Sequence, residues 1–312
     1  MTDRCDIETR LARWSANALQ LIVKYPVLWS FRSQLIALSE YALVASVTRL
    51  WRPAASEWAR IVVQLLSEAN NQERMAHALD SIPSSASALA WIVEAQTSFA
   101  LSPFISIDYL LDALLKRATV PVTNGYPYGG MEALYMHYRL VTATGVSGNT
   151  NGSQPEFSFN WEEGHLLSFR EIYELVHAVF YLTDFGRHGW KAGYEILPSY
   201  RSQIGAALSR AAMICMNEGH FDLIGEIVFA ARCLGHTEDV GTLEGVLLNA
   251  QLVEGAIPAW RGARGIRYLY HSSLVGLLAL WSARRYSLPL HRQAQMASEA
   301  RGSLSGIHTP RM

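Results

Sequence analysis

Apolar residues recur along most of the chain at intervals of three and four positions, the spacing that places them on one face of an α-helix. The first such stretch, 7–23, stops before Pro26. Alternation of apolar and polar residues, which indicates strands, is scarce, so the sequence predicts an all-α protein. The other predicted helices are 31–51, 56–69, 72–82, 87–101, 106–118, 130–144, 168–184, 199–217, 221–234, 238–253 and 266–284.

Short turns between these helices indicate antiparallel hairpins. Gly-His steps at 164–165, 219–220 and 235–236 each lie beside the end of a predicted helix, and glycine there suits the left-handed backbone that closes a helix. Stacked helical hairpins form α/α toroids or compact helical-repeat solenoids, and we expect one of these two arrangements. No strict period recurs, so no named repeat is predicted.

The same helical character on both sides of the middle of the chain predicts a single helical domain over 1–291. The segment 145–155 is rich in Gly, Asn and Ser and reads equally as a mobile loop or a linker, with 145–153 the expected site of limited proteolysis. The aromatic, Gly-rich stretch 124–130 reads as a loop that closes over a pocket or simply joins two helices. The tail 292–312 is weakly patterned, and we expect it to be weakly ordered.

Composition excludes several classes of protein. Half of the residues are hydrophobic and 17% are charged, which suits a large packed core. The formal net charge is -1 and no basic patch stands out, so we expect no nucleic-acid partner. The apolar runs are far shorter than the ~20 residues of a membrane helix, and the start of the chain does not read as a signal peptide. We therefore expect a cytoplasmic protein without a membrane partner.

The most informative stretch is 177–186, because polar residues share one face of an otherwise apolar helix. His177, Tyr181 and Asp184 stand at i, i+4 and i+7. A carboxylate in the last helical turn opposes the helix dipole, so Asp184 predicts either a cationic partner or a functional role. The plainer alternatives are an Asp184 that pairs with an arginine or caps a neighbouring helix, and a His177 that is hydrogen-bonded within the core.

Two later segments place further ionisable groups in apolar helices. Asp222 and Glu226 stand at i and i+4, where like charges repel unless a metal, a shared proton or a cation separates them. Asp222 alone is equally suited to capping the start of its helix. His271 lies inside an apolar helix, with the same alternatives as His177.

These groups leave open a metal site. His177, His220 and His271 lie on separate predicted helices near carboxylates such as Asp222, a combination that iron or zinc accepts. None of them has the spacing of an established zinc motif, and the three cysteines have none either. Phosphate-binding loops, dinucleotide fingerprints and nucleophile elbows are also absent from the sequence.

The block 177–186, together with 219–222 and 270–276, resembles an uncharacterised bacterial family of all-helical proteins catalogued as a domain of unknown function. The likeness covers most of the second half of the chain and weakly the first. It implies a setting near genes of specialised metabolism, and it implies no particular reaction.

Two functions of different classes follow. The first is an enzyme of bacterial specialised metabolism that acts on a small molecule or peptide, as a monomer or homodimer, in an aromatic-lined pocket. Its acid–base groups would be His177, Tyr181, Asp184, Glu226 and His271, its metal ligands His177, His220, Asp222 and His271, and a cyclase would use Asp184 as proton donor. The second is a non-catalytic helical-repeat module that binds a protein or peptide. We predict that His177, Asp184 and His271 face one interior cavity bordered by 220–226, as the enzyme requires.

Overall fold

A computed structural model describes residues 4–25, 29–49, 51, 53–68, 85–103, 105–119, 128–144, 167–186, 198–236 and 240–286. These residues form eleven helices and include no strand, which confirms the all-α prediction. The helices are α1 (Arg4–Lys24), α2 (Phe31–Thr48), α3 (Pro53–Glu68), α5 (Ser85–Ser98), α6 (Ile107–Thr119), α7 (Tyr128–Thr144), α8 (Phe169–Leu182), α9 (Pro198–Glu218), α10 (Phe221–Cys233), α11 (Val240–Ala250) and α12 (Ile266–Tyr286).

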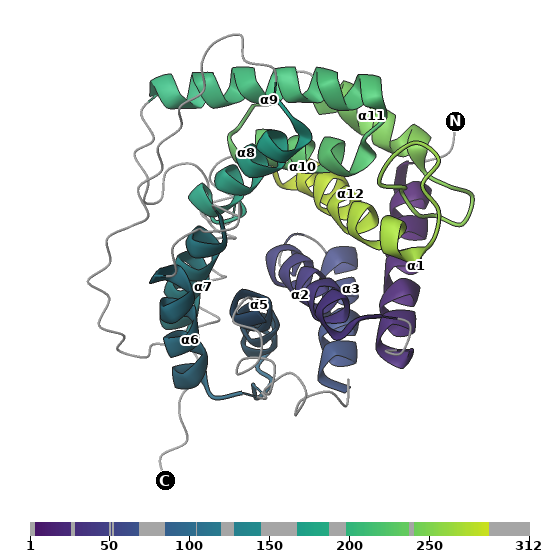
Figure 1. Cartoon of the computed structure of the whole chain (residues 1–312). Helices are drawn as coiled ribbons and strands as arrows, with labels where there is room; N and C mark the ends of the chain where they lie inside the picture. Colours follow the sequence, from purple (N-terminus) through teal and green to yellow (C-terminus); the bar gives the residue numbers. More distant parts are fainter. Residues whose placement is uncertain are drawn as a thin grey trace.

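Two helices organise the packing. In the first part of the chain α2 packs against α3 and α5, while α5 also contacts α6 and α7. In the second part α10 packs against α8, α9, α11 and α12. The contact of α12 with α2 and with α1 joins the two groups, and Figure 1 shows α12 between them. None of the helices among the described residues has the length and apolar content needed to cross a membrane.

Glycine ends α9 and α10 as the sequence predicts. Gly219 and Gly235 have φ angles of 67° and 72°, in the left-handed region. The next residue in each case donates its backbone N–H across the end of the helix, over 2.9 Å, to the carbonyl of Cys215 or Ala231. This is the Schellman arrangement, in which glycine avoids the steric cost of a Cβ atom. The third Gly-His step, 164–165, lies outside the described residues.

The helix α8 ends in the same way without a glycine. Its last helical residue is Leu182, and the N–H of Phe185 donates to the carbonyl of Phe180 over 2.7 Å. Asp184 therefore takes the left-handed position, with a φ angle of 49°, and Phe185 follows at 52°. The expectation that Asp184 stands in the last turn of the helix is wrong by two residues. The residue sits in a conformation that costs a side chain about 1 kcal/mol or more.

Close approach of α10 and α12 also depends on glycine. A Cβ atom built on Gly225 would lie 2.9 Å from Cγ1 of Val275 and 3.4 Å from the Val275 carbonyl carbon. The absence of a side chain thus lets two helix backbones pack together. The residue after this glycine is Glu226, so the same contact brings its carboxyl group to α12.

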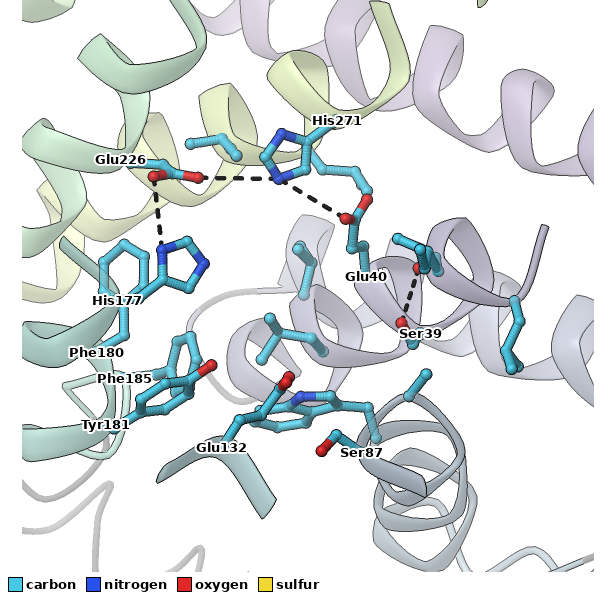
Figure 2. Close-up of a pocket in the computed structure, with 18 of the residues that line it drawn as sticks. Ser39, Glu40, Ser87, Glu132, His177, Phe180, Tyr181, Phe185, Glu226 and His271 are labelled. Carbon is cyan, nitrogen blue, oxygen red and sulfur yellow. Dashed lines mark hydrogen bonds and ion pairs between the residues drawn. The ribbon is translucent and has the colours of Figure 1, made fainter. Parts of the chain in front are cut away.

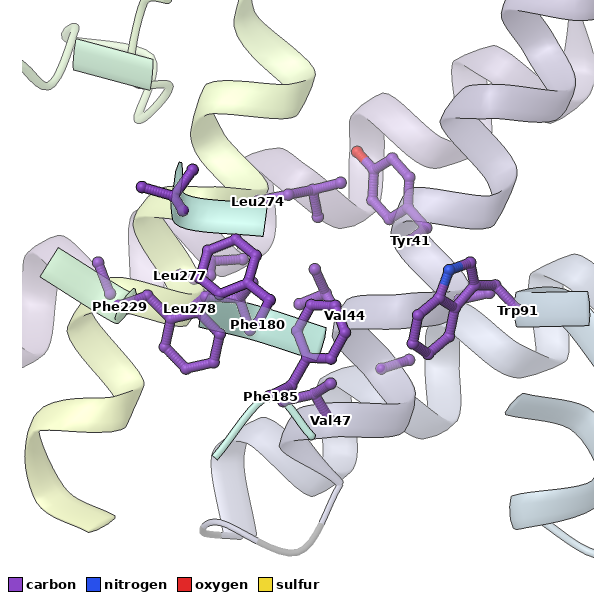
Figure 3. Packing of buried hydrophobic residues seen from close by; sticks show 14 of the residues in the cluster. Tyr41, Val44, Val47, Trp91, Phe180, Phe185, Phe229, Leu274, Leu277 and Leu278 are labelled. Carbon is purple, nitrogen blue, oxygen red and sulfur yellow. The ribbon is translucent and has the colours of Figure 1, made fainter. Parts of the chain in front are cut away.

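The core that surrounds this contact is rich in aromatic rings. Phe180 stacks on Phe185 with ring centroids 5.3 Å apart, and it also meets Phe229 of α10 at 5.2 Å. Leucines of α12 and valines of α2 fill the space between them (Figure 3). Pairs of this kind add about 0.5–1.5 kcal/mol to the burial of their surface.

Several predicted features lie outside the described residues. They are the helix at 72–82, the loop or linker at 145–155, and the tail 292–312. The aromatic stretch 124–130 is described only from its fifth position, where α7 already begins at Tyr128, so the loop prediction is wrong for 128–130.

Candidate functional site

A cavity of about 590 Å³ lies among α2, α5, α7, α8, α10 and α12. This volume falls within the range of about 300–1,000 Å³ that small-molecule sites occupy. Aromatic side chains form much of one side, namely Tyr173, Phe180, Tyr181 and Phe185, with Trp91 across from α5. Four ionisable groups from separate helices, Glu40, His177, Glu226 and His271, converge at one end of it (Figure 2).

His271 of α12 is the centre of this polar end. Its Nδ1 is 2.9 Å from Oδ1 of Asp222 on α10, and its Nε2 faces the cavity. Burial lowers the pKa of His271, but the negative charges of Asp222 and Glu40 raise it by more, so the pKa stands well above 6.5. The imidazole is therefore protonated at neutral pH and carries a transferable proton on Nε2.

Glu226 lies between two imidazole rings. One carboxyl oxygen is 3.8 Å from Nε2 of His271, and the other is 3.9 Å from Nδ1 of His177. Both distances exceed a hydrogen bond, and Oε2 has no hydrogen-bond partner among the described residues. Burial raises the pKa of Glu226 well above 4.5, and repulsion from Asp222 raises it further, as the i, i+4 spacing of the two acids suggests.

His177 of α8 is in the opposite state of charge. Its Nδ1–H donates a 2.9 Å hydrogen bond to the backbone carbonyl of Tyr173, and the two rings lie 3.8 Å apart. Burial lowers the pKa of His177 to about 4, so the ring is neutral at pH 7. Since Nδ1 holds the proton, Nε2 carries the lone pair and can accept one.

Two carboxyl groups that line the cavity were not predicted from the sequence. Glu40 of α2 approaches Nε2 of His271 to 3.9 Å, and burial raises its pKa while His271 and the hydroxyl of Tyr270 lower it by less. Glu132 of α7 lies across the cavity from His271 (Figure 2) and bonds to Trp91, and burial raises its pKa to about 7. The signal that revealed Glu226, an acid within an apolar helix, was also present at Glu40.

Asp184 does not line the cavity. Its Oδ2 is 3.0 Å from Nη1 of Arg139, and its Oδ1 accepts a hydrogen bond from the hydroxyl of Tyr135. Arg139 in turn binds Oε1 of Glu94 over 2.6 Å. The prediction that Asp184 shares the cavity is therefore wrong, and its alternative, a buried aspartate paired with arginine, is correct. The position of Asp184 therefore does not support the hypothesis of a cyclase in which Asp184 is the proton donor.

His220 also lies outside the cavity lining. It is the residue before α10, where its ring packs on Phe169 with centroids 4.8 Å apart, and burial lowers its pKa. Within the described ranges no group of three or more His, Cys, Asp or Glu side chains is arranged to hold a metal ion. The expected iron or zinc ligand set of His177, His220, Asp222 and His271 is thus not assembled: Asp222 pairs with His271 and does not cap α10 with its side chain.

The other predicted site residues lie either in the cavity lining or directly behind it. His177, Tyr181, Glu226 and His271 line the cavity, with Asp222 directly behind His271. Tyr181 contributes an aromatic wall, with its ring 5.2 Å from that of Tyr135. The site is therefore a pocket with an acid–base end and an aromatic body.

The comparison with protein families matches residues 10–281 to a family described as a domain of unknown function (DUF6895). Because the match covers most of the chain, the protein belongs to that family. No curated protein and no solved structure matches the chain significantly.

Proposed function

We propose that the protein is an acid–base enzyme that relocates a proton on a small organic molecule bound in the cavity. His177 takes a proton from the substrate at Nε2, and His271 gives one to another atom of the substrate from its own Nε2. The substrate loses one proton and gains one, so its composition is unchanged and no oxidant or reductant is needed. An isomerisation is the reaction class with this balance.

The observation that supports this proposal is a single buried carboxyl flanked by two imidazoles whose pKa values move in opposite directions. Glu226 lies 3.8 Å from His271 and 3.9 Å from His177. The pKa of His271 is raised well above 6.5, while that of His177 falls to about 4. Neighbouring groups whose pKa values the environment shifts in opposite directions are typical donors and acceptors of catalytic protons.

Glu226 also provides a route that resets the pair. After one turnover His177 holds an extra proton and His271 lacks one. The Nε2 proton of His177 leaves to solvent, which restores the resting tautomer with its proton on Nδ1. Glu226 passes a proton from Oε1 to Nε2 of His271 after small movements of the side chains, and it takes a proton back from solvent. Asp222 is a positioning residue here, because it fixes the ring of His271 through Nδ1 and stabilises its charged form.

Deuterium incorporation tests this function while the identity of the substrate is still open. A low-molecular-weight metabolite extract is incubated with the enzyme in D2O, and mass spectrometry identifies compounds that gain one mass unit or change retention time. We expect His271→Gln to abolish the change. His236→Gln is the matched control, because His236 bonds to the backbone of Arg201 and lies outside the cavity lining. Equal turnover by wild type and His271→Gln would overturn the proposal.

The alternative is a module that binds a ligand without reacting with it. It predicts that the extract contains a compound retained by the protein, with no deuterium incorporated. A peptide-binding surface is the less favoured form, because the ionisable groups gather in a cavity and not along an exposed face. Following the sequence, we also propose a cytoplasmic setting in bacterial specialised metabolism, and an α/α toroid or a compact helical-repeat solenoid as the arrangement of the helices.

A further inference from the structure

The polar end of the cavity is rich in hydrogen-bond acceptors. Glu226 is 2% exposed, and its Oε2 has no hydrogen-bond partner among the described residues. Oε2 of Glu40 is also buried without a hydrogen-bond partner among the described residues, although the Glu40 side chain is 26% exposed and interacts with the hydroxyl of Tyr270. Nε2 of His177 adds a third acceptor, because the proton of this ring lies on Nδ1. A buried acceptor left unsatisfied is unfavourable, and a ligand with donors would satisfy it.

The ionisable groups at this end of the cavity also favour a ligand that donates hydrogen bonds. Four ionisable groups face Glu226 from the helices packed around it: Asp222, His271, His177 and Glu40. The one positive charge among them, on His271, lies nearest to Asp222 at 2.9 Å and is shared with Glu226 and Glu40 at 3.8 Å and 3.9 Å. In the described part of the chain no lysine or arginine forms an ion pair with Glu226 or Glu40. Burial raises the pKa values of Glu226 and Glu40, and a ligand with a positive charge would favour the ionised form of both carboxyls.

The geometry also suits the shape of one particular cationic group. Oε1 of Glu226 and Oε1 of Glu40 lie 3.8 Å and 3.9 Å from the same atom, Nε2 of His271, so both acceptors border one small volume. A primary ammonium group has three N–H donors and no acceptor, which suits a cavity end where two carboxyl oxygens and Nε2 of His177 are acceptors. A hydroxyl group would satisfy fewer of them, and a carboxylate would be repelled.

The aromatic wall completes the match. Tyr173 and Tyr181 of α8 line the cavity next to His177, and Trp91 lines it from α5. Aromatic faces attract cations within about 6 Å, and they also cover an apolar ligand body. Arg32 and Arg117 border the cavity too, and Arg117 acts on Glu132 at the far end.

We propose that the cavity binds an organic ammonium ion with an aromatic or similarly apolar body, whose ammonium group sits against Glu226, Glu40 and His177. This names the substrate class of the proposed enzyme, and so it rests on that function for its catalytic meaning. As a statement about binding it stands on the acceptors, the charges and the aromatic wall alone.

Matched probes of nearly equal shape test the proposal. Tryptamine, indole-3-ethanol and indole-3-propionate differ in the terminal group, as do 2-phenylethylamine, 2-phenylethanol and 3-phenylpropanoate. Calorimetry with the full chain at pH 7 should show each amine binding at least about 10-fold more tightly than its alcohol, because charge-assisted hydrogen bonds contribute about 1.5–3 kcal/mol. The carboxylates should bind most weakly. Amines that bind no better than their alcohols, or not at all at millimolar concentration, would overturn the proposal.

Variants locate the ammonium group. Glu226→Gln keeps the shape of the side chain and should weaken amine binding by about 10-fold or more while leaving alcohol binding within about 3-fold. Alcohol binding shows that the variant is folded, and Glu40→Gln provides a second variant with the same expectation. Glu57→Gln, which alters an exposed glutamate of α3, is the control and should change neither affinity. An equal loss for amine and alcohol in both cavity variants would contradict the placement.

Proton release gives a readout that a merely structural role would not move. Calorimetry in phosphate and in Tris separates the heat of buffer protonation from the heat of binding. We expect the wild type to release up to about one proton per bound amine, because the incoming cation drives buried carboxyls to ionise, and Glu226→Gln to release less. Amine binding without deuterium exchange would contradict the proposed enzymatic function and support the ammonium site. Deuterium exchange confined to neutral molecules would support the enzymatic function and contradict the ammonium site.

Discussion

The carboxylate of Asp184 and the guanidinium of Arg139 form an ion pair of 3.0 Å inside the protein. The aspartate side chain is 12% exposed and that of the arginine 14%. The pair holds the left-handed end of α8 against α7, and Glu94 of α5 binds the same arginine. It therefore anchors the helix that carries His177 and Tyr181 to the cavity wall.

Asp184→Asn should reduce stability while leaving ligand binding in place. The variant keeps the shape but removes one of the two carboxylates that bind Arg139 in the described structure, so we expect a loss of about 1–3 kcal/mol in the free energy of unfolding. Urea denaturation measures it. Asp112→Asn, which removes an exposed pair with Lys116, should change stability by less than about 1 kcal/mol. If Asp184→Asn instead removed deuterium exchange at unchanged stability, Asp184 would belong to the chemistry.

Two glycine substitutions should have opposite effects. Gly225→Ala places a methyl group 2.9 Å from the stiff side chain of Val275 and should lower the free energy of unfolding by about 1–3 kcal/mol. Gly245 of α11 has open space around the same position, so Gly245→Ala should raise it by about 0.5–1 kcal/mol through helix propensity alone. Thermal or urea unfolding compares the two, and a stabilised Gly225→Ala would refute the close contact.

Glu132→Gln should stabilise the protein increasingly as pH rises. The folded pKa of Glu132 is raised to about 7, mainly by burial, from 4.5. Between pH 4.5 and 7 the folded state therefore holds a proton that the unfolded state has released, and the wild type loses stability as pH rises through this window. Glutamine resembles the protonated acid, so its advantage should grow to at most ~3 kcal/mol at about pH 7 and stay constant above it.

The control for this prediction is Glu57→Gln, whose difference from the wild type should change little with pH. Urea unfolding of both variants and the wild type at several values between about pH 5 and 8 provides the measurement. A constant difference for Glu132→Gln across this range would show that Glu132 is not held protonated by its surroundings.

Asp222→Asn should lower the pKa of His271. Burial alone lowers this pKa, and the charge of Asp222 is the largest contribution that raises it. Titration of the imidazole nitrogens by ¹⁵N NMR should show a drop of about one unit or more in the variant, since an opposite charge within hydrogen-bond distance shifts a pKa by about 1–3 units. The pKa of His137, which burial lowers, should be the same in the variant and the wild type. An unchanged His271 would mean that Asp222 only orients the ring.

The helices and their ends were predictable because their signals are local. Periodicity located the eleven described helices, and Gly219 and Gly235 marked two ends correctly. The end of α8 was not predictable to the residue, since Asp184 replaces the usual glycine. Its partners, Tyr135 and Arg139, stand 49 and 45 positions earlier in the chain, and no local pattern connects them.

The candidate site was predictable in part for the same reason. His177, Glu226 and His271 stood out because each is ionisable within an apolar helix. His220 was predicted as a metal ligand from the sequence. In the structure it lies at the start of a helix, and its ring packs on Phe169. Glu132 lies near the start of α7, where an acid is ordinarily exposed, so its burial depends on Trp91 and on the packing of distant helices.

The walls of the cavity come from distant parts of the chain: Glu40 lies on α2 and His271 lies on α12. A ligand that touches both acts as a non-covalent crosslink between regions more than 200 positions apart in the chain. Each half of the polypeptide expressed alone would therefore lack the pocket altogether. Recombination between relatives that separated α2 from α8, α10 and α12 would replace part of the cavity lining.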